Sequence, residues 1–309
     1  MHQLITSRFL DDYLVVCPGS IAGIKIPVRQ FAELEQAAKS GAPAPSWLIK
    51  AARQRWAMDL APASPVRNYL LLRESAEPQY SRASWEINLG CNYDCEHCYL
   101  GLKKFEGLSM ADKARLLHVM RDAGVLWLQI TGGEPTIDRD FTDSYALAYE
   151  LGMMITISTN GSRLWQPKIL DALTRMPAYR VVVSVYGATA ASYDGLTRRR
   201  GSFAAFQKGM AAALEAGIPM RLNLVVTEHS ADEEAAMWRW PSAGGWSTTA
   251  TSTCPRRSTA GTSHCPRSPP STCGSGRCSP AAMPVTPSST PTRTARRRSA
   301  RSAATRTWT

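Results

Sequence analysis

The sequence predicts an α/β fold in which a parallel sheet is covered by helices. Strand-like and helix-like segments alternate from Trp85 to Val226, the pattern of consecutive βα units. The strand-like segments are almost continuous runs of apolar residues, which is typical of strands buried on both faces. Right-handed βα units in series form a barrel or part of one. We therefore expect a partial TIM-like barrel, preceded by a small α+β module and followed by a tail that is expected to be disordered.

The first 80 residues predict a small leading module. Two apolar runs flank an acidic pair, as in a β-hairpin with its turn at Asp11-Asp12. Helical composition follows twice, and a short strand ends the module. The expected elements are strands at Leu4–Leu10, Tyr13–Cys17 and Tyr69–Leu72 and helices at Gln30–Ala38 and Pro45–Ala57. A hairpin followed by helices resembles the winged-helix modules that hold leader peptides in peptide-modifying enzymes. An N-terminal extension that packs on the barrel is the alternative.

Residues 81–239 predict the barrel itself. Each apolar strand is followed by an amphipathic segment, and the first helix begins after Ser109, a residue suited to accept hydrogen bonds as an N-cap. The expected strands are Trp85–Leu89, Leu126–Thr131, Met154–Ser158, Arg180–Val185 and Met220–Val226. The expected helices are Ser109–Asp122, Asp143–Leu151, Gln166–Leu173 and Ser202–Ala216. In such folds the active-site residues lie at the carboxyl ends of the strands.

Three cysteines follow the first of these strands with the spacing C-x3-C-x2-C. Cys91, Cys95 and Cys98 supply three soft ligands within eight residues, which suits a thiophilic metal centre. Zinc sites and ferredoxin-type clusters usually have four protein ligands, so three leave one position open. Buried free cysteines or one disulfide are the structural alternatives.

The cysteine spacing and the aromatic Tyr99 after it resemble the radical S-adenosylmethionine (SAM) enzymes. The resemblance implies a [4Fe–4S] cluster on Cys91, Cys95 and Cys98, with SAM bound to the open iron. It also implies that an electron from the cluster splits SAM into methionine and a 5′-deoxyadenosyl radical, which takes a hydrogen atom from the substrate. Tyr99 is then expected near the adenine.

The segment Gly132-Gly133-Glu134-Pro135, directly after the second strand, matches the GGEP motif of that family. The resemblance implies that it meets the amino group of SAM, with Glu134 as acceptor. Two glycines also allow the backbone to approach a ligand closely.

Polar residues at the ends of the later strands complete the expected SAM site. Ser158 and Asn160 end the third strand, where hydroxyl and amide groups can bind a ribose. Ser184 lies in the fourth strand, and Asn223 in the fifth is expected near the ribose or adenine. Arg198, within a run of three arginines, is expected to pair with the SAM carboxylate. A turn, for Ser158 and Asn160, and a solvated basic loop, for Arg198, are the structural alternatives.

The net charge of +11 belongs to the tail at 240–309. This segment contains ten arginines and no Lys, Asp or Glu, so the rest of the chain has 26 basic and 25 acidic residues. The folded part therefore gives no electrostatic reason to expect nucleic acid as a partner.

The tail has no apolar periodicity with which to bury a core. It is interpreted as a disordered basic tail, as an extra metal module on its four cysteines, or as a shifted reading frame. We favour the shifted frame, because moving residues 281–290 back by one base allows Cys-Asn-Ala-Gly-His. That sequence resembles the auxiliary-cluster (SPASM or twitch) extensions of peptide-modifying radical SAM enzymes.

The sequence thus predicts a radical SAM enzyme that acts on a ribosomally made peptide. A radical SAM enzyme for a small molecule or cofactor precursor, and an inactive cluster-binding remnant, are the alternatives. The resemblance implies a precursor peptide and an electron donor such as a flavodoxin or ferredoxin as partners. With no signal peptide or apolar segment of the ~20 residues that span a bilayer, and eight cysteines, we expect a cytoplasmic protein without a membrane partner.

Overall fold

A parallel β-sheet organises the larger part of this computed structural model, which describes residues 2–77, 80–100, 103–104, 107–228, 230–244 and 247–252. The strand order is β10-β9-β8-β7-β6-β5, so each strand pairs with its neighbours in sequence, and every pair is parallel. The strands are β5 (Arg82–Asn88), β6 (Trp127–Gly132), β7 (Met154–Thr159), β8 (Arg180–Val185), β9 (Met220–Val226) and β10 (Ser247–Ser252). β5 and β10 are the two edges of this order, and the expected partial barrel of an α/β fold is confirmed.

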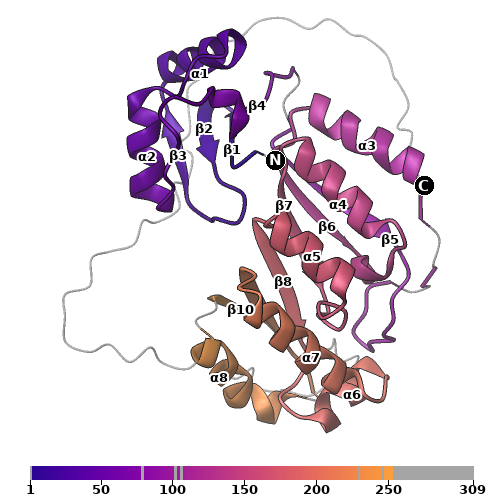
Figure 1. The fold of residues 1–309 in the computed structure, drawn as a ribbon. Coiled ribbons are helices and arrows are strands. Elements are labelled where there is room, and N and C mark those ends of the chain that lie inside the picture. Colours follow the sequence, from indigo (N-terminus) through magenta and orange to yellow (C-terminus); the bar gives the residue numbers. More distant parts are fainter. Residues whose placement is uncertain are drawn as a thin grey trace, which may run out of the picture. The chain divides into compact units, whose positions relative to one another are not determined.

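Helices follow the strands and lie over one face of the sheet, as Figure 1 shows for α3, α4 and α5. The helices are α3 (Met110–Asp122), α4 (Phe141–Glu150), α5 (Pro167–Arg175), α6 (Ala190–Thr197), α7 (Ser202–Glu215) and α8 (Glu234–Gly244). The expected N-cap of α3 is confirmed, since Ser109 Oγ accepts a hydrogen bond from the N–H of Asp112 at 3.2 Å. The short helix α6 was not expected. Its Gly195 and its serine and threonine residues give only a weak helical signal.

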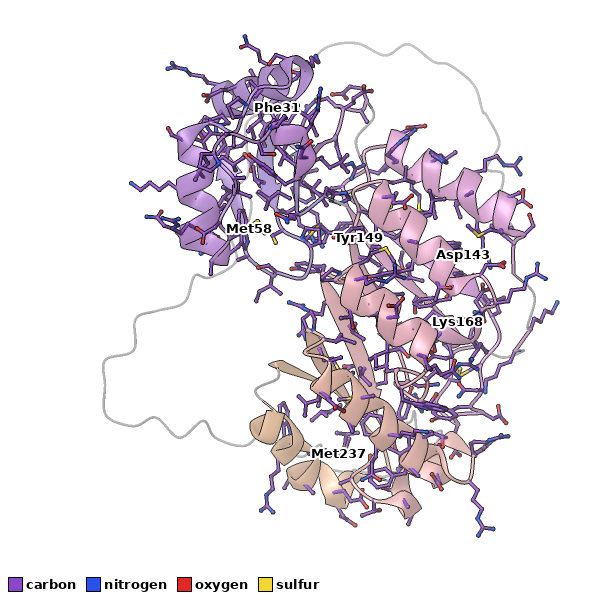
Figure 2. All side chains as sticks on the ribbon, in the orientation of Figure 1. Phe31, Met58, Asp143, Tyr149, Lys168 and Met237 are labelled. Atoms are coloured by element: carbon purple, nitrogen blue, oxygen red, sulfur yellow. The ribbon has the colours of Figure 1, made fainter. Side chains whose placement is uncertain are left out.

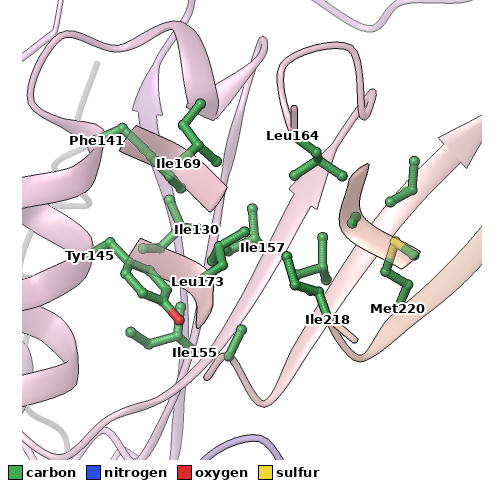
Figure 3. Close-up of a cluster of buried hydrophobic side chains, with 14 of the residues drawn as sticks. Ile130, Phe141, Tyr145, Ile155, Ile157, Leu164, Ile169, Leu173, Ile218 and Met220 are labelled. Carbon is green, nitrogen blue, oxygen red and sulfur yellow. The ribbon is translucent and has the colours of Figure 1, made fainter. Parts of the chain in front are cut away.

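The main hydrophobic core lies between the sheet and these helices. Alternate strand residues such as Ile130, Ile157 and Val183 are fully buried, whereas the residues between them are less buried. Figure 3 shows Ile130, Ile155 and Ile157 packed against aliphatic and aromatic side chains of α4 and α5. The helix-facing side of the sheet is therefore apolar, and the opposite side keeps polar residues.

The first 72 residues form a separate four-stranded sheet with the order β3-β2-β1-β4. The expected hairpin is confirmed as an antiparallel β1/β2 pair, and β4 is parallel to β1. The elements are β1 (Leu4–Phe9), β2 (Asp12–Val16), β3 (Gly23–Ile26), α1 (Val28–Ser40), α2 (Ser46–Trp56) and β4 (Leu70–Leu72). Phe31 and Leu48 are buried between the helices and the strands, and Phe31 and Met58 are labelled within this part in Figure 2. The short strand β3 was missed because Gly23 and Lys25 leave only two apolar residues in it, too few to show an alternation of apolar and polar side chains.

Specific contacts join this module to the barrel strands. Ile5 and Val16 are buried in one cluster with Leu126 and Met154. Arg73, only 6% exposed, donates hydrogen bonds to the backbone carbonyl oxygen of Val125 at 2.7 Å and to two further carbonyls. Burial and, to a smaller extent, the nearby charge of Arg121 lower the pKa of Arg73 to about 10. The module therefore packs on the barrel strands.

The expectation that structure ends at residue 240 was wrong. Helix α8 continues to Gly244, and Met237 within it is fully buried in the main core (Figure 2). β10 pairs in register with β9 from Ser247 to Ser252. Because strand pairing uses backbone groups, and threonine suits strands, this segment can pair without an apolar pattern. Residues 253–309, with all four tail cysteines, lie outside the described residues.

None of the helices in the part of the chain that the structure describes is long and apolar enough to cross a bilayer.

Candidate functional site

The cysteine loop, residues 89–100, follows β5 at the carboxyl edge of the sheet. Its backbone is held by the end of α6, since two loop N–H groups donate to the last carbonyl oxygens of that helix at 3.0 and 3.1 Å. Tyr93 in the loop is 4% exposed, and its hydroxyl donates to the carbonyl oxygen of Ser202 at 3.2 Å. Long-range contacts therefore fix the loop on the barrel.

The three loop cysteines are half-buried free thiols. Burial raises the pKa of the Cys91 thiol, and burial together with Cys91 and Cys98 raises the pKa of Cys95 to about 12. Among the described residues, no three Cys, His, Asp or Glu side chains are arranged to hold a single metal ion. A [4Fe–4S] cluster takes one thiolate on each of three irons, so its ligands need not converge on one point. Bound iron would also supply the positive charge that ionises a buried thiol, and the donor set thus fits such a cluster.

The Gly132-Gly133 turn lies directly against the backbone of the cysteine loop. The N–H of Gly133 donates to Asn88 O at 3.0 Å, and the N–H of Glu134 donates to Gly90 O at 2.8 Å. A Cβ atom would lie 2.1 Å from Asn88 O if added to Gly132, and 2.0 Å from Gly90 O if added to Gly133. Only glycine therefore allows this approach, which brings the second strand end to the thiols.

Glu134 is fully buried and lies between two turns. Its carboxylate accepts hydrogen bonds from the N–H of Asn160 and the hydroxyl of Thr159, both at 2.7 Å, and from the N–H and hydroxyl of Thr136. Burial raises the pKa of this carboxyl, whereas the hydrogen bonds from Thr136 and Asn160 act in the opposite direction. The side chain thus fastens the turn after β6 to the turn after β7.

Asn160 joins the β7 turn to the cysteine loop. Its Nδ2 donates to Asn92 Oδ1 at 2.8 Å, and Asn92 Nδ2 donates to Ser162 Oγ at 2.9 Å. The Oδ1 atom of Asn160 accepts from both the N–H and the hydroxyl of Ser162. The amide side chain is engaged with protein atoms, so it positions the loop.

A cavity of about 360 Å³ opens between the cysteine loop and the strand ends. This volume lies within the roughly 300–1,000 Å³ usual for small-molecule sites. Its lining comes from the loop and from the ends of β6, β7, β8 and β9. The lining residues are Cys91, Tyr93, Cys95, His97, Cys98, Tyr99, Thr131, Gly132, Gly133, Ser158, Thr159, Asn160, Ser184, Tyr186, Asn223 and Val225. The structure thus brings ten of the thirteen expected site residues together.

Three polar residues of the cavity come from the successive strands β7, β8 and β9. Ser184 and Asn223 are direct partners in the β8/β9 register, and Ser158 lies on β7. Ser158 Oγ accepts a hydrogen bond from Gln129 Nε2 at 2.9 Å. These groups present hydroxyl and amide atoms to whatever occupies the cavity.

Three expected site residues do not line the cavity: Glu134, Pro135 and Arg198. Glu134 and Pro135 are both buried. Arg198 caps the end of α6 with φ +50°, and its side chain is more than half exposed. Its Nη2 lies 3.5 Å from the carboxylate of Glu96. In this arrangement the guanidinium pairs with the cysteine loop.

Three aromatic residues of the cavity were not among the expected site residues: Tyr93, His97 and Tyr186. The rings of His97 and Tyr186 lie 5.3 Å apart, and the buried Nδ1 atom of His97 has no hydrogen-bond partner among the described residues. The alternation of β8 could have identified Tyr186, two residues after Ser184, whereas the position of His97 between two of the cysteines gives no sequence signal of its own. Tyr99 is 72% exposed, and its hydroxyl donates to the carboxylate of Glu86 at 2.6 Å.

The geometry matches what comparisons with known proteins find. Residues 85–238, about half of the chain, match the model of the Radical SAM superfamily. The AdoMet-dependent heme synthase of Nitratidesulfovibrio vulgaris is 28% identical over 157 residues, which cover 50% of this chain and 42% of that protein. The mycofactocin maturase MftC of Mycobacterium ulcerans is 32% identical over 152 residues, which cover 48% of this chain and 40% of that protein. The matched part spans about two fifths of the length of these relatives.

Solved structures share the fold at low sequence identity. SuiB of Streptococcus suis bound to the precursor peptide SuiA gives a TM-score of 0.55 at 16% identity, over 81% of this chain and 62% of SuiB. SuiB bound to S-adenosylmethionine gives a TM-score of 0.53 at 16% identity, over 82% of this chain and 62% of that chain. This likeness concerns the fold.

Proposed function

The chain belongs to the radical SAM superfamily through residues 85–238, and on that premise we propose that it is an enzyme that cleaves SAM reductively. In this proposal Cys91, Cys95 and Cys98 hold a [4Fe–4S] cluster, and SAM binds in the adjoining cavity. The observation that carries the proposal is this one cavity, lined both by the three thiols and by the ends of four parallel strands. When bound, the cluster supplies the electron that splits SAM into methionine and a 5′-deoxyadenosyl radical.

The residues of this chain then divide into those that touch SAM and those that position them. Backbone atoms of Gly132 and Gly133 lie at the thiols and suit the methionine end of SAM. Ser158, Ser184 and Asn223 supply polar atoms for the ribose and the adenine.

Glu134 and Asn160 act as positioning residues, because their side chains are engaged between the turns and the cysteine loop. Arg198 was expected to pair with the SAM carboxylate. In this arrangement it does not take that role, since its guanidinium lies outside the cavity.

Anaerobic reconstitution with iron and sulfide tests the proposal. We expect a brown protein that forms 5′-deoxyadenosine from SAM after reduction with titanium(III) citrate. Cys95→Ala should lose most of the iron and the product, because one of three ligands is removed. Cys17→Ala is the matched control, since Cys17 is a buried free thiol of the N-terminal module. A cluster that forms without SAM cleavage would instead favour the inactive remnant, and equal iron in both variants would contradict the ligand assignment.

We further propose a ribosomally made peptide as the substrate. MftC is named a maturase, SuiB has been solved with a precursor peptide, and the fold is shared with SuiB. The N-terminal module also leaves β3 as an edge strand, flanked by the exposed side chains Ile21 and Val28. An edge strand of this kind can pair with an extended peptide, so residues 1–80 are proposed to bind a leader segment.

A small molecule is the competing substrate class, because a heme synthase is similarly related over the same part of the chain. The two classes separate in one assay. A short peptide encoded beside the gene, incubated with the reduced protein and SAM, should change mass if the peptide proposal is right. An unchanged peptide mass, with 5′-deoxyadenosine formed only when a porphyrin or other small molecule is added, would favour the alternative.

A further inference from the structure

Three consecutive arginines form an exposed cationic surface where α6 ends. Arg198, Arg199 and Arg200 are all exposed, and we refer to them as the arginine patch. The patch does not line the cavity proposed for SAM. It therefore lies outside that cavity, and its charge is available to a partner in solution.

The patch lies directly beside the cysteine loop. The N–H groups of Asp94 and Glu96, on either side of Cys95, donate to the carbonyl oxygens of Thr197 and Leu196 at 3.0 and 3.1 Å. These two carbonyls belong to the last turn of α6, immediately before the patch begins. A protein bound to the arginines would thus stand next to the thiol ligands.

The charges around the loop are incompletely balanced within the described residues. Asp94 pairs with Lys103 at 2.6 Å, and Glu96 pairs with Arg198 at 3.5 Å. Arg199 and Arg200 form no ion pair with any described residue. An exposed, uncompensated cationic surface attracts an acidic partner and raises its rate of association.

We propose that the arginine patch is the docking surface for an acidic one-electron carrier protein that reduces the cluster. This inference rests on the proposed function, because it assumes a cluster on the cysteine loop. The reduced carrier passes one electron through the loop side of the site, so the carrier is oxidised by one electron and the cluster is reduced by one. No proton and no bond are exchanged in this step.

The test uses purified flavodoxin as the carrier and the full chain with its cluster reconstituted. Binding of oxidised flavodoxin is measured by biolayer interferometry, and cluster reduction by flavodoxin hydroquinone is followed by stopped-flow absorbance. The variant Arg199→Glu/Arg200→Glu reverses the two unbalanced charges. The variant Arg29→Glu/Arg55→Glu makes the same change of net charge at two exposed arginines of the N-terminal module. Thermal melts of both variants confirm that they are folded.

We expect the patch variant to weaken flavodoxin binding and slow cluster reduction about tenfold or more at low salt. The control variant should stay within about twofold, and all three proteins should converge near 0.5 M salt, where charges are screened beyond about 4 Å. Equal losses in both variants would show a general effect of net charge, and no loss in the patch variant would place docking elsewhere. Either result overturns the proposal.

Titanium(III) citrate separates this proposal from the proposed function. The small reductant needs no docking surface, so it should reduce the cluster and drive SAM cleavage equally in all three proteins. If it drives no SAM cleavage in any of them, the proposed function fails. The binding of oxidised flavodoxin to the patch is still decided by the first measurement.

Discussion

Replacing Gly133 by alanine tests how the site is built, because this glycine lies where two backbones meet. A Cβ atom there would be 2.0 Å from Gly90 O and 3.1 Å from the Cβ of Cys91. Ordinary contact begins at 3.4 Å, so the turn and the cysteine loop would have to separate by about 1.4 Å. Gly90 O is a backbone atom and the Cβ of Cys91 is bonded directly to the backbone, so neither can move away by a side-chain rotation.

That separation breaks two backbone hydrogen bonds. The bonds from Gly133 N to Asn88 O and from Glu134 N to Gly90 O are now 3.0 and 2.8 Å long, and both would exceed hydrogen-bonding distance. Leaving a buried polar group unpaired costs about 1–3 kcal/mol, so we expect Gly133→Ala to lower the free energy of unfolding by about 2–6 kcal/mol. It should also lower the affinity for SAM, because the turn moves away from the thiols.

Urea denaturation of the apoprotein and SAM binding by the reconstituted protein measure the two effects. Gly217→Ala is the control, since a Cβ atom there meets nothing within 4 Å and only its φ of +66° is unfavourable. We expect this control to lose about 1 kcal/mol and to keep its SAM affinity. If Gly133→Ala matches the control in stability and binds SAM like the unmodified protein, the close approach of the two backbones does not organise the site.

Three further predictions concern other parts of the chain. Lys113→Met should lower the free energy of unfolding by about 3–5 kcal/mol in urea, because Lys113 is 1% exposed and its loss leaves Asp138 without its ion-pair partner and Asp140 with only the exposed Arg139; a change under about 1 kcal/mol would contradict this. Asp194→Asn should cost about 1 kcal/mol at pH 7, since this carboxylate accepts two backbone N–H groups at the start of α7. Burial acts to raise the pKa of Asp194, but these hydrogen bonds lower it. The contribution of Asp194 to stability is therefore present above the unfolded pKa of about 4 and is lost as the pH falls below it. A difference in melting temperature between the two proteins that persists at pH 2 would refute the assignment. The DNA near codon 240 should show a one-base shift, and an uninterrupted gene whose close relatives carry the same Arg/Ser/Thr tail would exclude it.

Much of the fold could be predicted because its signals are local. The strands from Trp85 onward were recognised by their apolar runs, and helix α3 by its N-cap. β3 and α6 were missed because glycine and polar residues interrupt their periodicity. β10 was missed for another reason, since its pairing depends on the exposed edge of β9 and not on its own side chains.

The candidate site likewise combines features predicted from local sequence with features that depend on the fold. The spacing of Cys91, Cys95 and Cys98 and the two glycines after β6 are short-range patterns, and the sequence alone assigned them to one site. Which side chain faces the cavity depends on the register between strands and on the paths of the turns. Arg198 shows this, because its guanidinium lies beside Glu96 and does not line the cavity.

The sequence by itself determined the chemistry, since three thiols at this spacing, followed one βα unit later by a Gly-Gly turn, specify which ligands are available. Only the tertiary structure decided how they are held. It shows that Glu134 fastens two turns together, that Asn160 ties the β7 turn to the cysteine loop, and that α6 supports that loop from outside. The physical reason is that these contacts join residues far apart in the chain, and a buried polar group takes whichever partners the fold brings to it.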